Sequence, residues 1–531
     1  MNKLFSTLRC NRFGQWFCIA VACGWSANVL AVSPGTIQQG RTLFERNWPT
    51  GNPTISSDGL GPLFNGTSCV ACHHQGGVGG SGDARFNAQA IGIERYQFSG
   101  LIRAQDKVGL ISNFFPGFVQ PDGSVMNTAS IPHHGGSAQY ASVRESLLSQ
   151  INTMRSEHGG PVNASEVRLS NQAPIRYSGQ SHLMKLTAEA RLFQRNTTAM
   201  FGAGLVDAIP DKVLVQQERL QSRHPEISGR LSILRDGSLG RFGWRANVSK
   251  LVRFVDRACA NELSLETKRM PQATDPARPG YRNPAPDISD DQIEAMSEFI
   301  ASLPRPIERQ SDDHDTLEAV KLGRAAFESV GCAVCHVPKL GAVDGLYSDL
   351  LLHDMGPNMY DYDAAEPQVI KQTPAVGVGE VPGSRQHSYY GVSTQLPGAA
   401  GSGVNDSFVS PRSSQATEDY VTVRTGQEFG RIVTAVNQTA RVRAEMRILR
   451  KLKPTNTSQE WKTPPLWGIA DSAPYMHDGR AETLLEAISL HEGESAGTRD
   501  RFLQLPLRDR KAMITFLETL VAPPNAPKPV L

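Results

Sequence analysis

The feature that most constrains this chain is a five-residue string that occurs twice in its 531 residues. The first copy is Cys69-Val70-Ala71-Cys72-His73, and the second is Cys332-Ala333-Val334-Cys335-His336. A Cys-x-x-Cys-His string is the attachment signature of c-type haem, and the adjacent His can reach the iron. We therefore expect two covalently bound haem c groups with His73 and His336 as proximal iron ligands. A zinc site or a redox-active dithiol is the weaker alternative.

The first 31 residues have the pattern of a secretory signal. Basic residues precede an apolar run from Trp16 to about Val32, and small residues allow cleavage after Ala31. A lipoprotein with Cys23 acylated is less favoured, because Ala20 rather than a large aliphatic residue lies three positions before it. We expect a periplasmic or secreted protein and no membrane span, since polar residues interrupt the run at Gly24, Ser26 and Asn28.

The use of cysteine agrees with export. Of eight cysteines, three lie in the first 31 residues and four belong to the haem strings, which leaves Cys259. We therefore expect no intramolecular disulfide and interpret Cys259 as a small buried hydrophobic residue. A formal net charge of +2 gives no reason to propose nucleic acid or anionic lipid as a partner.

The residues around the two haem strings repeat as well. Gly40 and Phe44 precede the first string, and Gly323 and Phe327 precede the second with the same spacing. Residues four apart share one face of a helix. We expect an opening helix before each haem loop, with the glycine at a close approach of another helix.

A second pair of matching segments supplies that other helix. Apolar residues recur with identical spacing over 295–303 and 512–520, and Pro304 and Pro523 follow them. Each closing helix is expected to cross the opening helix, an arrangement that resembles the cytochrome c fold.

The predicted fold class is mainly α, with two cytochrome c-like haem domains and long loop insertions. The expected boundaries are a signal peptide over 1–31, an N-terminal haem c domain over 32–305 and a C-terminal haem domain over 306–531. The larger insertions belong to the N-terminal domain, because over two hundred residues separate its haem string from its closing helix. Segments rich in Pro, Gly, Asn and Ser predict loops over 113–136, 271–286 and 374–414, and a linker over 304–315.

Several longer strings carry a resemblance to a known family. The most specific are Trp461–Gly468 and Ala473–Arg480, and others are Tyr347–Gly356, Phe201–Pro210 and Gly240–Trp244. Together they resemble the bacterial di-haem cytochrome c peroxidase superfamily, and most closely its branch of di-haem oxidoreductases. The resemblance covers most of the mature chain and is weakest over 75–180. The rubber-cleaving di-haem oxygenases are similar at a greater distance.

The resemblance implies a sixth ligand for the second haem. In the family this ligand follows the His-Asp-Gly string by fourteen residues, and fourteen residues after His477 stands His491. His491 shares a helical face with Leu484 and Ile488, so its ring is expected to point inward. A His/His pair would give a low-spin haem suited to electron transfer. The residues leave other candidates open, namely Met355, Met359, Met476 and His353.

The first haem is expected to be open to a small oxidant. In the peroxidases a His shortly before a string like Arg195–Phe201 caps this haem, and no His lies within a dozen residues before Asn196. Phe201 is then expected to line the distal pocket, as similar apolar residues do in the oxygenase relatives. The alternative is that His182 closes the site.

The resemblance also implies a relay and a cation site. Trp244 is the only Trp between the haem strings and is the candidate for electron transfer between the haems. A calcium ion in the relatives is held by an Asn side chain and two backbone carbonyls, positions that match Asn196, Ser472 and Pro474. Plain core packing and an ion-free junction are the respective alternatives. No residue stands out as the distal acid or base, for which the candidates are Gln75, Gln89, Glu94 and Gln97.

Three functions follow as expectations. The leading one is an exported peroxidase-like di-haem oxidoreductase, with peroxide bound at the first haem and a redox partner such as a small c-type cytochrome. The second is an oxygenase that uses dioxygen on an apolar substrate. The third is a non-catalytic electron carrier with both irons six-coordinate.

Overall fold

The computed structural model describes residues 32–49, 59–99, 165–177, 180–234, 236–273, 282–360 and 459–528, with short pieces at 57, 129–130, 145, 369–371, 420–423 and 431–434. The expected signal segment 1–31, the expected loop 374–414 and almost all of the expected loop 113–136 lie outside these residues. Within the described part, no helix combines the length and the apolar character needed to cross a membrane.

Most helices of the described residues fall within 203–330 and 484–517. The helices are α1 (Pro34–Glu45), α4 (Ala203–Asp207), α5 (Asp211–Gln221), α6 (Leu251–Glu262), α7 (Asp290–Ser302), α8 (His314–Val330), α11 (Leu484–Ser489), α12 (Ala496–Gln504) and α13 (Leu507–Leu517).

Most of the described strands are short. They are β1 (Leu63–Phe64), β2 (Ala88–Ser99), β3 (Ala129–Ser130), β4 (Ser165–Tyr177), β5 (Gln180–Arg195), β6 (Ile307–Glu308), β7 (Lys339–Leu340), β8 (Val343–Asp344), β9 (Leu352–Asp354), β10 (Val369–Lys371), β11 (Tyr420–Val423), β12 (Arg431–Thr434), β13 (Glu460–Lys462) and β14 (Leu520–Val521).

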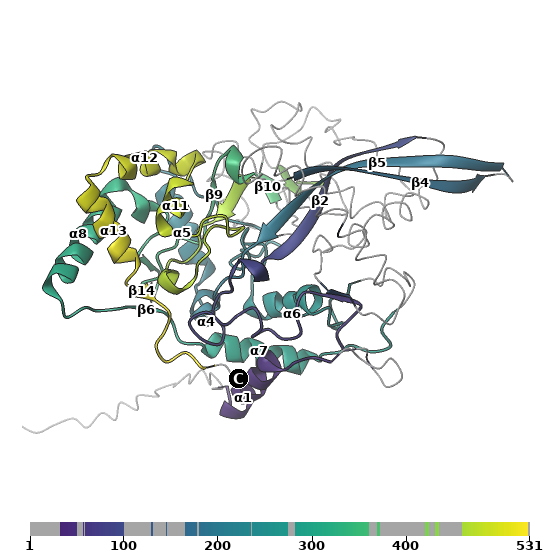
Figure 1. The fold of residues 1–531 in the computed structure, drawn as a ribbon, viewed down its shortest axis with the longest axis horizontal. Helices are drawn as coiled ribbons and strands as arrows, with labels where there is room; N and C mark the ends of the chain where they lie inside the picture. The colour runs from purple at the N-terminus through teal and green to yellow at the C-terminus, as the bar shows by residue number, and fades with distance from the viewer. Residues whose placement is uncertain are drawn as a thin grey trace, which may run out of the picture.

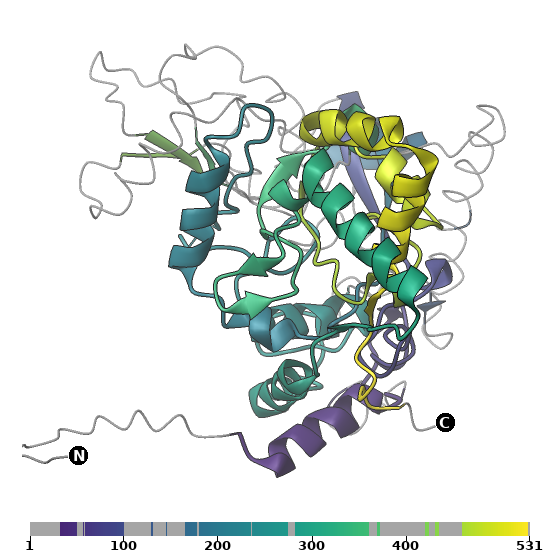
Figure 2. The same ribbon diagram turned by 90° about the vertical axis from the view of Figure 1, so that its left-hand side faces the viewer.

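Two crossed helix pairs organise the molecule, α1 with α7 and α8 with α13 (Figures 1 and 2). A Cβ on Gly40 would lie 1.9 Å from the Ala295 carbonyl oxygen, and a Cβ on Gly323 would lie 2.0 Å from the Ala512 carbonyl oxygen. Each glycine therefore allows its helix to touch the backbone of the partner helix. This confirms the predicted close approach in both halves, with the two alanines at equivalent positions.

Local signals explain where these helices begin and end. The side chain of Ser33 caps α1, with Pro34 at the first helical position, and Ser289 and Gln292 form a capping box at α7. The helix α8 ends at Gly331, whose φ of 100° is accessible to glycine. The haem string follows at once, so this turn directs the chain from the helix into the attachment loop.

Each helix pair packs its own apolar core. The rings of Phe44 and Phe299 lie 5.5 Å apart in the first, and those of Phe327 and Phe516 lie 5.6 Å apart in the second. Cys259 is 2% exposed and belongs to the first core, which confirms its interpretation as a small buried residue. None of the described cysteines forms a disulfide.

The expected linker is more ordered than its composition indicates. Within 304–315 the strand β6 pairs with β14, so that Ile307 lies opposite Val521, and α8 already begins at His314. Leu520 correspondingly lies in β14 rather than in the closing helix, which ends at Leu517. The charged stretch between the halves is thus held against the C-terminal end of the chain. The described parts of 271–286 contain neither helix nor strand, as expected.

The insertion of the N-terminal half differs from the predicted loops. The strands β2, β5 and β4 form a three-stranded antiparallel sheet that extends away from the helices as an arm (Figure 1). Ala88 pairs with Arg195 at one end, and Tyr177 pairs with Gln180 at the other. The reason is the period-two alternation of apolar and polar residues over 184–192, which is typical of a strand. The prediction of long loops was therefore wrong for these residues.

Replacing Gly40 with Ala should destabilise the protein by about 3 kcal/mol, because the new methyl group overlaps the Ala295 carbonyl. Gly35→Ala in the same helix is the matched control. Its Cβ meets only the Ser33 hydroxyl, at 3.6 Å, so the higher helix propensity of Ala should stabilise by up to about 1 kcal/mol. Urea unfolding of both variants measures the difference, and equal stability would contradict the close helix crossing.

Candidate haem sites

The two haem strings form equivalent loops. The His73 amide donates to the Cys69 carbonyl at 3.0 Å, and the His336 amide donates to the Cys332 carbonyl at the same distance. The ring centres of Phe44 and His73 are 6.4 Å apart at 52°, and those of Phe327 and His336 are 6.4 Å apart at 53°. The opening helix thus sets the orientation of each histidine through the phenylalanine predicted to pack there.

Hydrogen bonds leave both histidines suited to bind a metal. The Nδ1 atom of His73 lies 3.1 Å from the Gly80 carbonyl oxygen, and that of His336 lies 3.0 Å from the Tyr347 carbonyl oxygen. Since a carbonyl only accepts, Nδ1 carries the proton and Nε2 keeps its lone pair. Burial lowers the pKa of both histidines to about 4, so the rings are neutral at pH 7.

The cysteines do not resemble a redox-active pair. Burial raises the pKa of Cys69 to about 12 and that of Cys72 to about 11, and it raises the pKa of Cys332 to about 12. A reactive dithiol needs a thiolate, which a lowered pKa provides. The raised pKa values therefore weigh against the dithiol alternative for both strings.

A cavity of about 690 Å³ opens beside the first string, within the range of roughly 300–1,000 Å³ for cofactor pockets. Cys69, Cys72 and His73 line it. So do five residues that the sequence singled out from distant parts of the chain, namely Phe201, Trp244, Asn196, Ser472 and Pro474. The structure thus assembles these predicted site residues around one space.

Asn196 connects several of these residues. Its carbonyl oxygen accepts from the Trp244 indole at 3.0 Å, and its amide nitrogen Nδ2 lies 2.5 Å from the Pro474 carbonyl oxygen. The side chain is 8% exposed, and its Oδ1 atom has no hydrogen-bond partner among the described residues. A buried free amide oxygen beside a carbonyl suits Ca²⁺, which prefers oxygen ligands. The hydroxyl of Ser472, whose backbone carbonyl is the expected ligand, donates to the Ile469 carbonyl at 3.1 Å.

The second string has another histidine facing it. The ring centres of His336 and His491 are 6.4 Å apart, and the Nδ1 atom of His491 lies 2.7 Å from the Ala487 carbonyl oxygen. Two imidazoles bound to one metal from opposite sides, each through a bond of about 2 Å, separate their ring centres by roughly 6 Å. The geometry therefore fits a shared iron. The helix α11 ends at Ser489, so His491 lies just past the helix rather than on its face.

One of the competing candidates for this sixth position, Met355, has another contact: its sulfur lies 3.9 Å from the Ser495 hydroxyl. His477, which is not among the candidate ligands, stacks its ring on Trp461 at 3.6 Å. The Arg245 guanidinium also packs over Trp461, at 4.1 Å. Burial, followed by nearby arginines, lowers the pKa of His477 well below its usual value.

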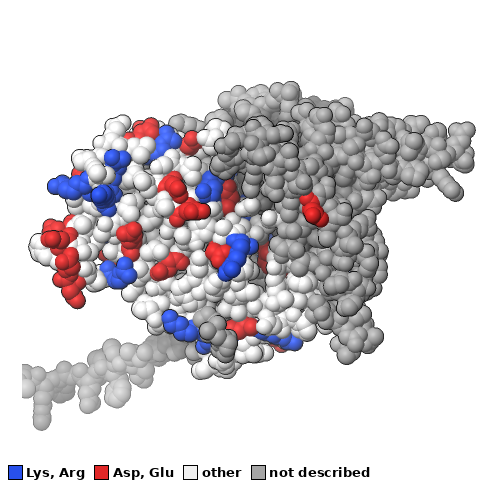
Figure 3. Space-filling model, viewed as in Figure 1, with Lys and Arg blue, Asp and Glu red and all other residues white. Residues whose placement is uncertain are grey.

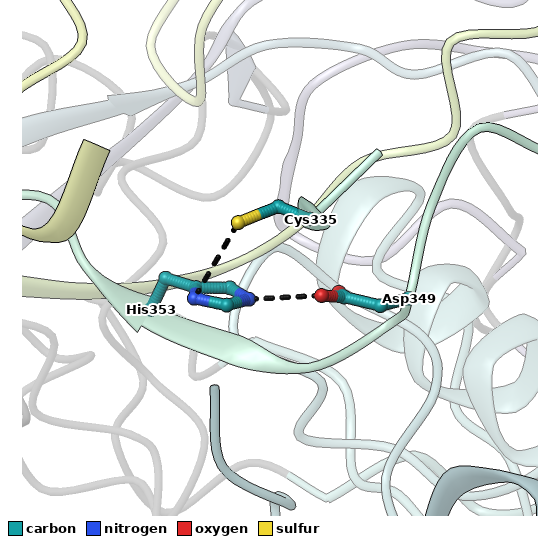
Figure 4. Close-up of side chains that lie close together, drawn as sticks. All are labelled: Cys335, Asp349 and His353. Carbon is teal, nitrogen blue, oxygen red and sulfur yellow. Dashed lines mark hydrogen bonds and ion pairs between the residues drawn. The ribbon is translucent and has the colours of Figure 1, made fainter. Parts of the chain in front are cut away.

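His353 lies in a buried network beside the second string (Figure 4). Its Nε2 atom lies 3.0 Å from an Asp349 oxygen, and its Nδ1 atom lies 3.0 Å from a Glu494 oxygen and 3.8 Å from the Cys335 sulfur. Both ring nitrogens must be protonated to satisfy two carboxylates. Although burial opposes this, the Asp349 carboxylate raises the pKa of His353 well above its usual value. His353 is therefore a charged structural group and not an iron ligand.

The same network supports the loop that contains the second haem string. The Gln221 amide donates to the Val334 carbonyl at 2.8 Å and also to the Asp349 carboxylate. Ser228 fixes Glu494 with its amide and its hydroxyl, both at 2.9 Å. Cys335, Asp349 and His353 also form the one group within the described residues whose donor atoms could hold a metal ion. Because both nitrogens of His353 already bind carboxylates, we interpret the group as an ion network.

Sequence reasoning missed Glu262, which lines the first cavity. Burial raises the pKa of its carboxyl, and the Asn65 amide donates to it at 2.5 Å. The available signal was its place on the apolar face of α6, in line with Leu251, Val255 and Cys259. A carboxyl on such a face is expected to lie in a site rather than in solvent.

The residues proposed from less familiar segments lie elsewhere. Gln75 accepts from the Ser81 hydroxyl at 2.7 Å, and Gln97 pairs with Thr187 along the sheet. Gln89 pairs with Gln194, and Glu94 falls at the β-bulge of β2. His182 pairs with Ile175, thirteen residues along β5 from Arg195, or roughly 40 Å at the rise of a strand. The alternative that His182 closes the first site is not supported.

Comparisons with known proteins agree with this chemistry. Residues 453–520 match the family described as "Di-haem oxidoreductase, putative peroxidase", which confirms the resemblance and the oxidoreductase class of enzyme. No curated protein matches the chain.

Two solved structures show a weak likeness. Kuenenia stuttgartiensis hydrazine synthase, pressurized with 20 bar xenon, is 18% identical over 62% of this chain and 73% of its own, with a TM-score of 0.27. A MauG-like protein associated with microbial copper homeostasis is 16% identical over 59% of this chain and 90% of its own, with a TM-score of 0.24.

Replacing His353 with Gln should destabilise the protein by about 3–5 kcal/mol, because Asp349 and Glu494 lose their buried cation. A raised pKa stabilises the folded state below the unfolded pKa, and the effect is lost only as the pH rises through the folded value. Urea unfolding should therefore show the full difference at pH 6 and a smaller one in alkaline solution. His314→Gln, beside Asp315 but 85% exposed, is the control and should change little.

Proposed function

We propose that this chain is an exported di-haem c-type oxidoreductase of peroxidase type, with the signal over 1–31 directing it to the periplasm or the medium. The proposal depends on one asymmetry between two otherwise equivalent sites. His336 faces the ring of His491 at 6.4 Å. Among the described residues, no second histidine ring packs against His73, which instead borders a cavity.

The residues present fit two haem groups. Cys69 and Cys72 would attach the first and His73 would hold its iron, while Cys332 and Cys335 would attach the second. His336 and His491 would close both faces of the second iron, which suits electron transfer. Haem supplies one-electron chemistry and, at an open iron, a site for a small oxidant such as peroxide.

Three side chains that line the first cavity would have separate roles in the reaction. Phe201 is 3% exposed and keeps water out of the space beside it. Glu262 lines the same cavity, and burial raises the pKa of its carboxyl, so we assign it the role of exchanging a proton with a bound oxidant. Trp244 lines the cavity and bonds through its carbonyl to the Lys462 amide at 2.9 Å, so it joins the first site to the strand beside the second.

A haem-dependent oxygenase acting on an apolar organic substrate is the second candidate. The apolar side chains of Met200, Phe201 and Phe254 line the first cavity and favour such a substrate. Peroxide turnover with a small c-type cytochrome as donor, measured beside oxygen uptake on apolar substrates, separates the two. On the described part of the face shown in Figure 3, basic and acidic residues are interspersed rather than gathered into one charged patch.

Asn196, Ser472 and Pro474 would hold a calcium ion at the junction of the two halves. The free Oδ1 atom of Asn196 and the adjacent Pro474 carbonyl support this part of the proposal.

Changing His491 to Ala should convert one haem from low spin to high spin while both remain covalently attached, because the second imidazole is lost. Optical and EPR spectra and an acid-resistant haem stain measure the two properties. His74→Ala is the control, since His74 packs against Phe86 at 5.4 Å and should leave the spectra unaltered. Unaltered spectra in the His491 variant would show that another residue is the ligand.

Changing Glu262 to Gln should lower peroxide turnover about 10²- to 10⁴-fold, the usual contribution of a positioned acid or base. The amide can still accept from Asn65, so the resting spectra should not change. Glu294→Gln on the exposed face of α7 controls for the loss of one carboxylate. Wild-type turnover in the Glu262 variant would exclude this residue as the acid or base.

A further inference from the structure

Lys462 is a buried cation on the wall of the first cavity, and the residue is 9% exposed. It is the last residue of β13 and pairs with Leu352 of β9. Its amide donates to the Trp244 carbonyl at 2.9 Å. The backbone is thus held from two sides, so the position of the side chain is set by the fold.

The ammonium group has no partner within the described residues. None of the salt bridges or side-chain hydrogen bonds there includes Lys462. The carboxylate that affects the pKa of Lys462 is that of Asp349, which is already hydrogen-bonded to His353 and Gln221. Burial lowers the pKa of Lys462 to about 8, with Asp349 opposing the shift. A buried ammonium without a counter-charge is costly, which indicates that a counter-ion is missing.

The other cations around the cavity differ from Lys462. Arg241 donates to the Ile209 carbonyl at 2.7 Å and to Asp211 at 2.5 Å. Arg85 pairs with Asp83 at 3.1 Å, and Arg195 packs over Trp461. Arg257 is only partly buried, so water can solvate its charge. Among these cations, Lys462 is therefore the one whose charge a bound anion would stabilise most.

We propose that Lys462 binds a carboxylate in the first cavity and that a propionate of the haem supplies it. This inference depends on the proposed attachment of haem at Cys69 and Cys72. The two thioether bonds form at the vinyl groups, whereas both propionates leave the opposite edge of the porphyrin. A haem attached to Cys69 and Cys72 and lying in the cavity must therefore place its two propionates against the cavity wall farther from these cysteines. Lys462 lines that wall, and it comes from the other half of the chain.

The test compares Lys462→Met with Lys462→Arg in the holoprotein. The midpoint potential of each haem is measured against pH by spectroelectrochemistry, with attachment checked by haem stain and mass. Loss of a cation beside the propionate stabilises the ferric form and raises the propionate pKa. Lys462→Met should therefore lower the potential of the first haem and move its pH dependence to higher pH, with little effect on the second haem.

The charge-conserving variant and a surface variant complete the design. Lys462→Arg should keep the wild-type potential and pH profile, and so should Lys511→Met on the exposed side of α13. If Lys462→Met does not fold, Lys462→Gln takes its place with a polar group in the wall. Benzoate is added to each protein as a free carboxylate, and it should not perturb the first haem of the wild type.

Three results would overturn the inference, and they are distinguishable. An unchanged potential and pH profile in Lys462→Met, with both haems attached, means that no propionate meets this residue. A benzoate-dependent spectrum in the wild type that the Met variant abolishes assigns the carboxylate to an added molecule instead of the haem. Absence of covalent haem in the wild type would overturn the proposed function itself, and this inference with it.

Discussion

The close crossing of two helices is the constraint on which the rest of this structure depends. Gly40 brings α1 against the backbone of α7, and Gly323 brings α8 against α13 with almost the same separation. The phenylalanine four residues later then packs at 6.4 Å from the histidine of the following loop in both halves. The distance between two helix backbones thus determines where each histidine lies. A methyl group at either glycine would disturb a haem loop as well as a core.

The two haem strings form equivalent loops, but the two sites differ. The difference comes from the other residues that each half of the chain places beside its loop. In the second half the chain returns through α11, whose end carries His491 to within 6.4 Å of His336. In the first half the equivalent space is bordered by Phe201, Trp244 and Glu262. Under the proposed function, a haem held between two imidazoles would carry electrons, while a haem in the first cavity would admit a small molecule. The repeated frame and the separate additions would then let one fold support both tasks.

Local spacing accounts for what could be predicted from the sequence. The glycine crossings, the haem loops and the approach of His491 to His336 all follow from short-range patterns or from strings shared with relatives. The sheet that contains β5 was not predicted, although the alternation over 184–192 is typical of a strand, because its partner strands β2 and β4 lie within 75–180, where the resemblance is weakest. Glu262 was missed although its place on the apolar face of α6 was a local signal. Lys462 was missed because its burial depends on packing between segments far apart in the chain, which no local pattern shows.

The first cavity is completed by the second half of the chain. Asn196 donates to the Pro474 carbonyl, and its own amide donates to the His477 carbonyl at 2.8 Å. Trp244 and Lys462 are joined by a backbone hydrogen bond. Because Lys462 also lies opposite Leu352, next to the network of His353, the wall of one site is continuous with the support of the other. An electron that moves between the sites would therefore cross hydrogen-bonded backbone and stacked rings.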